Sequence, residues 1–177
     1  DLARDPDVEW VAPDHVARAT SVSAPNDPYY SSLWAMPKIN APAAWDVTTG
    51  SPAAVIAIID SGVDVNHGEF VGRVSGYSWV KQSTDINDEN GHGTQVSGVI
   101  GAASNNGVGV AGLCWGCRLL FVNAMQASGV ANYSDIADAI NYAYSNGAKV
   151  INLSLAGYSD SATLHDAIRN ATTGGTL

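Results

Sequence analysis

The 177 residues suit one domain, or one domain with a short appendage, and a hydrophobic fraction of 46% is enough for a buried core. Only 14% of the residues are charged, and 17 acidic against 8 basic side chains give a formal net charge of -9. This balance excludes binding of a nucleic-acid backbone by bulk charge and leaves room for a bound divalent cation. No apolar run reaches the length needed to span a membrane.

The first twenty or so residues differ in character from the rest. The segment 1-DLARDPDVEWVAPDH-15 is charged and contains prolines, with a short strand pattern inside it. Residues 18–28 are rich in Ser, Pro and Asn, which is typical of an exposed connection. The sequence therefore predicts a boundary near residues 19–25, with an appendage at 1–20 and the main domain at 21–177.

Beyond this boundary, strands and helices alternate. Continuous apolar runs predict buried strands, and apolar side chains at helical spacing predict helices. The expected strands are 53–59, 119–122 and 149–155, and the expected helices are 93–103, 134–147 and 161–173. The alternation predicts an α/β fold, a three-layer parallel sheet with helices on both faces. We expect this fold to be C-terminally incomplete, because Thr176 and Leu177 resemble the start of a further strand.

The two cysteines, Cys114 and Cys117, form a C-x-x-C pair directly before the predicted strand at 119–122. A thioredoxin-type redox pair is expected at the start of a helix instead. A zinc site needs a second pair of soft ligands, which the sequence lacks. A local disulfide and two free thiols both remain open.

Two short segments carry the candidate chemistry. The run 55-VIAIIDSGVD-64 leads a predicted buried strand straight into Asp60, and 91-GHGTQVSGVIGAA-103 presents His92 at the start of a predicted helix. Either residue alone is explained as well by turn or helix-start chemistry. Ligands gather at the carboxyl ends of parallel strands, where an aspartate can orient a histidine from the next helix. The histidine would then accept a proton from a hydroxyl nucleophile.

With these segments the chain resembles the subtilisin-like serine proteases, the subtilase family, and within it the thermitase-like branch. The segment 56-IAIIDSGVDVNHGEF-70 resembles the region of the catalytic aspartate, and 90-NGHGTQVSGVI-100 that of the catalytic histidine. The strand 150-VINLSLAG-157 is similar to the wall of the primary specificity pocket, and 26–51 to the mature N-terminus of the branch. The resemblance runs almost unbroken from about residue 24 to 177.

This resemblance implies a secreted or extracellular serine endopeptidase that cleaves peptide bonds with an Asp-His-Ser triad. Asp60 would be the orienting carboxylate, and His92 the general base and acid. Residues 1–20 resemble the end of the family's inhibitory propeptide, which would make the protein a zymogen. The expected partners are a peptide or protein substrate and the chain's own propeptide.

The resemblance also implies a peptide-binding cleft and a structural Ca²⁺ site. In the cleft, an extended substrate would lie between two rims as an added strand. The expected substrate-binding residues are Asn90, Gly129, Val130, Ala131, Tyr133, Ser154, Leu155 and Ala156. The expected calcium ligands are oxygens of Asp27, Glu69 and Asn106, with carbonyls near Ala103, Val108 and Val110.

The chain departs from the family pattern at several positions. Gln95 stands where a second histidine is usual, and Glu69 replaces a more common aspartate. Val130 and Ala131 replace a Ser-Gly pair. Ala156 replaces a glycine, and its methyl group would crowd the substrate backbone.

The largest departure concerns the nucleophile. In this family the serine follows the aspartate and the histidine in a G-T-S-x-A type segment, and the sequence contains no such segment. We therefore expect the chain as given to be inactive. The alternative is a non-catalytic, truncated scaffold of the same family that binds peptides or a partner. A nucleotide-binding α/β domain is disfavoured, because no glycine-rich phosphate loop joins the first strand to its helix.

Overall fold

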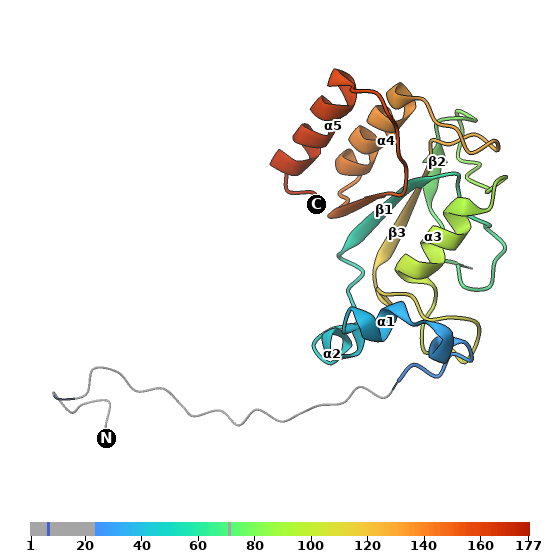
Figure 1. The fold of residues 1–177 in the computed structure, drawn as a ribbon, viewed down its shortest axis with the longest axis vertical. Coiled ribbons are helices and arrows are strands. Elements are labelled where there is room, and N and C mark those ends of the chain that lie inside the picture. Colours follow the sequence, from blue (N-terminus) through green and yellow to red (C-terminus); the bar gives the residue numbers. More distant parts are fainter. Residues whose placement is uncertain (1–6, 8–23, 71) are drawn as a thin grey trace.

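The computed structural model describes residues 7, 24–70 and 72–177, and Figure 1 shows a central sheet flanked by helices. The strands are β1 (Val55–Asp60), β2 (Gly76–Ser78), β3 (Arg118–Asn123) and β4 (Val150–Leu153). They lie in the order β2-β3-β1-β4, and every pair is parallel. The parallel α/β fold predicted from the sequence is confirmed.

Helices cover both faces of this sheet. The longer ones are α3 (His92–Gly101), α4 (Tyr133–Ser145) and α5 (Ala162–Thr173), and the shorter ones are η2 (Tyr30–Ser32), α1 (Ala35–Lys38) and α2 (Ala41–Trp45). Helices α4 and α5 pack together on one face, and α3 lies on the other (Figure 1). Helix α4 starts at Tyr133, one residue before the expected 134–147, and Asn132 rather than a residue of the expected helix occupies the N-cap position.

Strand β1 is buried on both sides because its alternate side chains enter two separate cores. Val55, Ala57 and Ile59 pack against apolar residues of α4 and α5. Ile58 points the other way and packs with Phe121 and the apolar side of α3. A continuous apolar run, rather than an alternating one, is what a strand between two helical layers requires.

The strand ends bring the carboxyl termini of β1 and β3 to one edge of the sheet. Asp60 is the last residue of β1 and is in register with Asn123, the last residue of β3. Strand β4 is shorter than the predicted 149–155, because residues 154–156 leave the sheet. Beside β4, Leu177 donates its amide to Lys149 O, and its carbonyl accepts from Ile151 N.

The predicted propeptide remnant at 1–20 and the boundary at 19–25 lie outside the described residues, apart from Asp7 and residues 24–25. Within the part of the chain that the structure describes, no helix is both long and apolar enough to cross a membrane.

Of the two alternatives for the cysteines, the structure shows the disulfide. Cys114 and Cys117 are bonded, with their Cα atoms 5.6 Å apart. The loop packs against the segment before β1: the amides of Trp115 and Gly116 both donate to Thr49 O. The disulfide thus closes a small loop that leads directly into β3.

Replacing both cysteines by serine is expected to lower the free energy of unfolding by about 2 kcal/mol, the loop-entropy value for a four-residue closure. Urea denaturation of the double variant and of the oxidised parent measures the difference. The parent treated with reductant is the control and should match the variant. Equal midpoints for all three samples would contradict a stabilising role.

Candidate active site

The centre of the site is a hydrogen bond between Asp60 and His92. The imidazole Nδ1 lies 2.7 Å from Asp60 Oδ1, which also accepts from the amide of Ser61 at 2.7 Å. A carboxylate only accepts, so this contact assigns the proton to Nδ1 and leaves Nε2 as the acceptor. Nε2 has no hydrogen bond within the described residues. In this arrangement the imidazole can act as a general base, because Nε2 is free to accept a proton from a donor.

The two partners differ in their exposure to water. The Asp60 side chain is 1% exposed, whereas that of His92 is 44% exposed. The second carboxylate oxygen of Asp60 is buried and has no partner within the described residues. A buried, incompletely compensated carboxylate is well placed to stabilise the imidazolium that forms when Nε2 takes up a proton.

The histidine is presented at close range because small residues let α3 approach the end of β1. A Cβ added to Gly93 would lie 2.2 Å from Gly62 O, so no other residue fits there without movement. Gly91, just before α3, has a φ of 98°, in the left-handed region that favours glycine. The glycines on both sides of His92 are therefore required by its position.

A second carboxylate, Asp88, lies next to this pair and was not predicted from the sequence. It accepts five hydrogen bonds, from Ser61 Oγ, the amides of Asn90 and Gly91, and the amide and hydroxyl of Thr94. Burial raises the pKa of the Asp88 carboxyl, but the bonds from Thr94 and from two backbone amides outweigh it and lower the pKa to about 2. The signal available in the sequence was an acidic residue just before a helix start.

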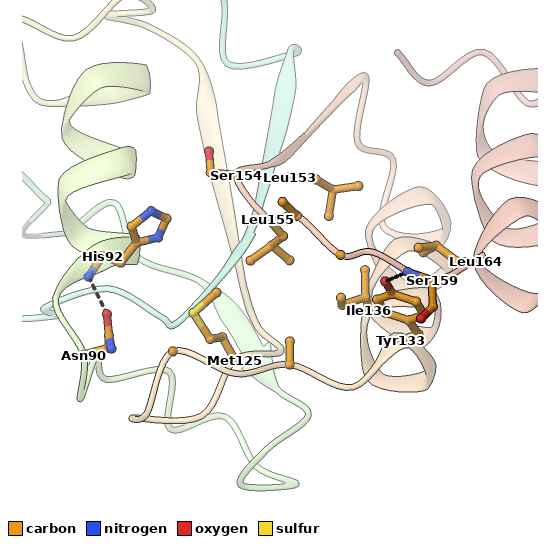
Figure 2. A pocket seen from close by; sticks show the side chains of 14 residues that line it. Asn90, His92, Met125, Tyr133, Ile136, Leu153, Ser154, Leu155, Ser159 and Leu164 are labelled. Atoms are coloured by element: carbon orange, nitrogen blue, oxygen red, sulfur yellow. Dashed lines mark hydrogen bonds between the residues drawn. The ribbon is translucent and has the colours of Figure 1, made fainter. Parts of the chain in front are cut away.

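The imidazole faces a cleft of about 460 Å³. Figure 2 shows His92 on one side of it and Ser154 with Leu155 on the other. Seven of the eight predicted substrate-binding residues line the cleft: Asn90, Gly129, Ala131, Tyr133, Ser154, Leu155 and Ala156. The eighth, Val130, does not line it and is 58% exposed.

The sequence did not predict several apolar and small residues of the lining: Met125, Ile136, Leu153, Gly157, Ser159 and Leu164. Three of them, Ile136, Leu153 and Leu164, belong to α4, β4 and α5. Their side chains also pack into the core of α4 and α5. A pattern that predicts core packing gives no sign that the same side chains also form a pocket floor.

Two hydrogen bonds hold the rims of the cleft. Asn90 Nδ2 donates to Ala127 O at 2.8 Å and so ties the rim after β3 to the start of α3. At the far end, the Tyr133 hydroxyl accepts from the amide of Ser159 at 3.4 Å (Figure 2). The cleft is therefore bounded by peptide backbone on two sides and floored by apolar side chains.

The predicted calcium ligands lie together at the opposite end of α3. Asp27 and Glu69 are each 4% exposed. Asp27 accepts from the amides of Asn105 and Asn106, and Glu69 accepts from Asn106 Nδ2 at 3.4 Å and from the amide of Val110 at 3.3 Å. The loop 103–110 also contains the three predicted carbonyl positions, Ala103, Val108 and Val110.

Among the described residues, neither carboxylate has a basic partner. No salt bridge joins Asp27 or Glu69 to a basic side chain among the residues described. The described residues also contain no group of three His, Cys, Asp or Glu side chains that could hold a metal ion. Any cation at this place would depend on the two carboxylates together with amide and carbonyl oxygens.

Comparison with known proteins places this geometry in context. A model of the subtilase family matches residues 51–177. A thermophilic serine proteinase of Bacillus sp. (strain AK1) is 42% identical over 172 residues, which cover 96% of this chain and 42% of that protein. Thermitase of Thermoactinomyces vulgaris is 42% identical over 149 residues, which cover 83% of this chain and 53% of thermitase.

A solved protease structure also matches this chain in its fold. Proteases from Pseudoalteromonas arctica PAMC 21717 match with a TM-score of 0.80 and 31% identity, covering 88% of this chain and 57% of that one. The chain spans about half the length of the relatives it matches.

Substituting Asp88 by asparagine is expected to destabilise the chain by about 1–2 kcal/mol at neutral pH. The difference between the ordinary pKa of 3.8 and the folded value of about 2 corresponds to about 2.4 kcal/mol, which partial exposure reduces. Because the folded pKa is the lower one, this contribution is complete above about pH 4 and is lost as the pH falls towards 2.

Urea unfolding of the parent and of Asp88→Asn, between pH 7 and pH 2, measures this difference. Glu89→Gln is the control, since it removes an exposed carboxylate of the same loop. A difference between parent and Asp88→Asn that does not change with pH would contradict the assignment.

Proposed function

The chain belongs to the subtilase family, and we propose that it contributes the aspartate and the histidine of a serine endopeptidase. The observation that carries the proposal is the 2.7 Å bond between Asp60 and His92 beside a peptide-sized cleft. In this proposal His92 Nε2 takes the proton of a serine hydroxyl during attack on the peptide carbonyl. It then returns that proton to the leaving amine, while Asp60 holds the tautomer.

The serine is proposed to come from residues outside this sequence. Ser154 shares the cleft with His92, but its Oγ accepts from Asn152 Nδ2 and has no bond to the imidazole. The side of α3 that carries His92 also presents Gln95 and Val99, and Val99 is 63% exposed. An additional segment packed on this side would reach the open Nε2.

The substrate is proposed to be an extended peptide that pairs with both rims of the cleft. Gly129 and Ala131 lie on one rim, and Ser154 and Ala156 on the other, so backbone groups are available on both sides. The floor between the rims is apolar, which favours apolar substrate side chains there. The Ala156 methyl narrows this passage compared with the glycine of the family pattern.

The alternative function is a non-catalytic scaffold that binds peptides. The cleft itself favours it, because its rims offer peptide backbone to a ligand without requiring a nucleophile. The two functions differ in one observable: a scaffold would bind a peptide and release it uncut.

We also propose that Asp27, Glu69 and Asn106 hold a structural calcium ion. Two carboxylates, each 4% exposed and without a basic partner among the described residues, impose a desolvation cost that a divalent cation offsets. Oxygen ligands from carboxylates, an amide and carbonyls are those that calcium prefers. The ion would fasten the segment before η2 to the loop after α3.

We further propose that the protein is secreted and is made as a zymogen. One relative is named as an extracellular protease of Xanthomonas campestris, and another as a halolysin-like extracellular serine protease of Natrialba magadii. The Cys114–Cys117 disulfide supports an oxidising compartment. Residues 1–20 are proposed to be the end of an inhibitory propeptide that is the chain's own partner.

In the complete protein, His92→Ala is expected to lower kcat for a peptide substrate about a million-fold, as loss of the histidine does in subtilisin. An internally quenched fluorescent peptide measures cleavage by the complete protein, by its His92→Ala variant and by residues 1–177 alone. His165→Ala, which changes an exposed histidine of α5, is the control and should keep full activity.

We expect no turnover by residues 1–177. Cleavage by that chain that disappears in His92→Ala would show that the nucleophile lies within it. A complete protein that binds the peptide without cleaving it would support the scaffold instead.

Removal of calcium is expected to lower the melting temperature by roughly 5–10 °C, since saturation at 100 times Kd adds about 2.7 kcal/mol and each kcal/mol shifts Tm by about 2–4 °C. Calorimetry with EDTA, and after addition of excess Ca²⁺ or Mg²⁺, measures this shift. Glu69→Gln should abolish the calcium response, whereas Glu89→Gln should keep it. A melting temperature that does not respond to chelation in the parent would refute the site.

A further inference from the structure

We propose that Asp88 is a positioning residue that sets the distance between Asp60 and His92. The catalytic meaning of this inference rests on the proposed protease function. Its evidence is a hydrogen-bond network that joins the end of β1 to the first turn of α3. The network contains two side-chain hydroxyls, and both donate to the one carboxylate.

The first hydroxyl belongs to the strand side. Ser61 Oγ donates to Asp88 Oδ1 at 2.8 Å and accepts from the amide of Gly93, in the helix, at 2.9 Å. The amide of the same serine donates to Asp60 Oδ1 at 2.7 Å. Ser61 is 2% exposed, so it has no water to replace a lost partner. Asp88 therefore fixes a residue that in turn fixes the carboxylate of Asp60.

The second hydroxyl belongs to the helix side and mirrors the first. Thr94 Oγ1 donates to Asp88 Oδ2 at 2.6 Å and accepts from the amide of Asp64, in the segment after β1, at 2.9 Å. Each hydroxyl thus donates its one hydrogen bond to Asp88 and accepts a hydrogen bond from an amide of the opposite segment. Without that acceptor, both hydroxyls would be free to turn away from the amides they hold.

Asp88 also fixes the backbone that leads into His92. Its carboxylate accepts from the amides of Asn90, Gly91 and Thr94, at 3.0, 2.8 and 2.9 Å, on both sides of the histidine. Its own amide donates to Val63 O at 3.1 Å, which anchors it to the segment after β1. One ionised group thus holds both halves of the catalytic pair, and its own depressed pKa of about 2 is consistent with this.

The test observes the proton on His92 Nδ1 directly by NMR in the ¹⁵N-labelled chain. An imidazole N–H bonded to a buried carboxylate gives a resonance at very low field and exchanges slowly with water. The chain has 4 histidines, and the resonance that His92→Ala removes is the one to follow. This readout does not require turnover.

In Asp88→Ala we expect the resonance to disappear, or to exchange at least about tenfold faster than in the parent. Asp88→Asn keeps one acceptor oxygen and should give an intermediate effect. Glu89→Gln removes one negative charge at the adjacent position, where the carboxylate binds Lys81, and should leave the resonance unchanged. This control separates a charge effect from the hydrogen-bond network.

A folded Asp88→Ala chain with the parent's resonance and exchange rate would overturn the proposal. If that variant does not fold, Ser61→Ala and Thr94→Val decide, because each removes one hydroxyl: faster exchange in both supports the proposal, and parental exchange in either overturns it. If the complete protein cleaves no peptide while Asp88→Ala still loses the resonance, the protease function fails and the positioning role stands.

Discussion

The site depends on one meeting point, where the carboxyl end of β1 touches the first turn of α3. Asp60 is the last residue of the strand and His92 the first of the helix, so a 2.7 Å bond between their side chains requires close backbone approach. Gly93 allows that approach, since a Cβ there would collide with Gly62 O. The rest of the structure keeps these two ends in place: cores on both faces fix β1, and the Asp88 network fixes α3.

The sheet explains why this meeting point is also the edge of a cleft. Parallel strands direct all their carboxyl ends to one side, so the residues that follow β3 and β4 lie at the same sheet edge as Asp60, the last residue of β1. Residues 154–156 leave β4 early and become one rim, while Gly129 and Ala131 contribute to the other. The Asp60–His92 pair and the cleft are thus two consequences of the same topology.

The sequence predicted the strongly buried elements well and the local exceptions poorly. Strands β1 and β3 were predictable because sheets covered on both faces need continuous apolar runs. Strand β2 was missed because it has only three residues, Gly76–Ser78. The segments around Asp60 and His92 predicted that the two would meet, and the structure brings them together. Asp88 was missed because its role depends on hydroxyls 27 residues before it and six after it, and nothing in its own segment shows that contact.

The buried or partly buried carboxylates of this chain differ in how many hydrogen-bond donors surround them. Asp60 has the imidazole of His92 and one amide, and its second carboxylate oxygen has no partner within the described residues. Asp88 has five donors, and the abundance of hydrogen bonds keeps it ionised to about pH 2. Among the described residues, Asp27 and Glu69 accept only from amide groups and have no basic partner. The catalytic proposal follows from the partly satisfied carboxylate of Asp60, and the positioning proposal from the fully hydrogen-bonded carboxylate of Asp88. The calcium proposal follows from Asp27 and Glu69, which have too few donors for two buried carboxylates.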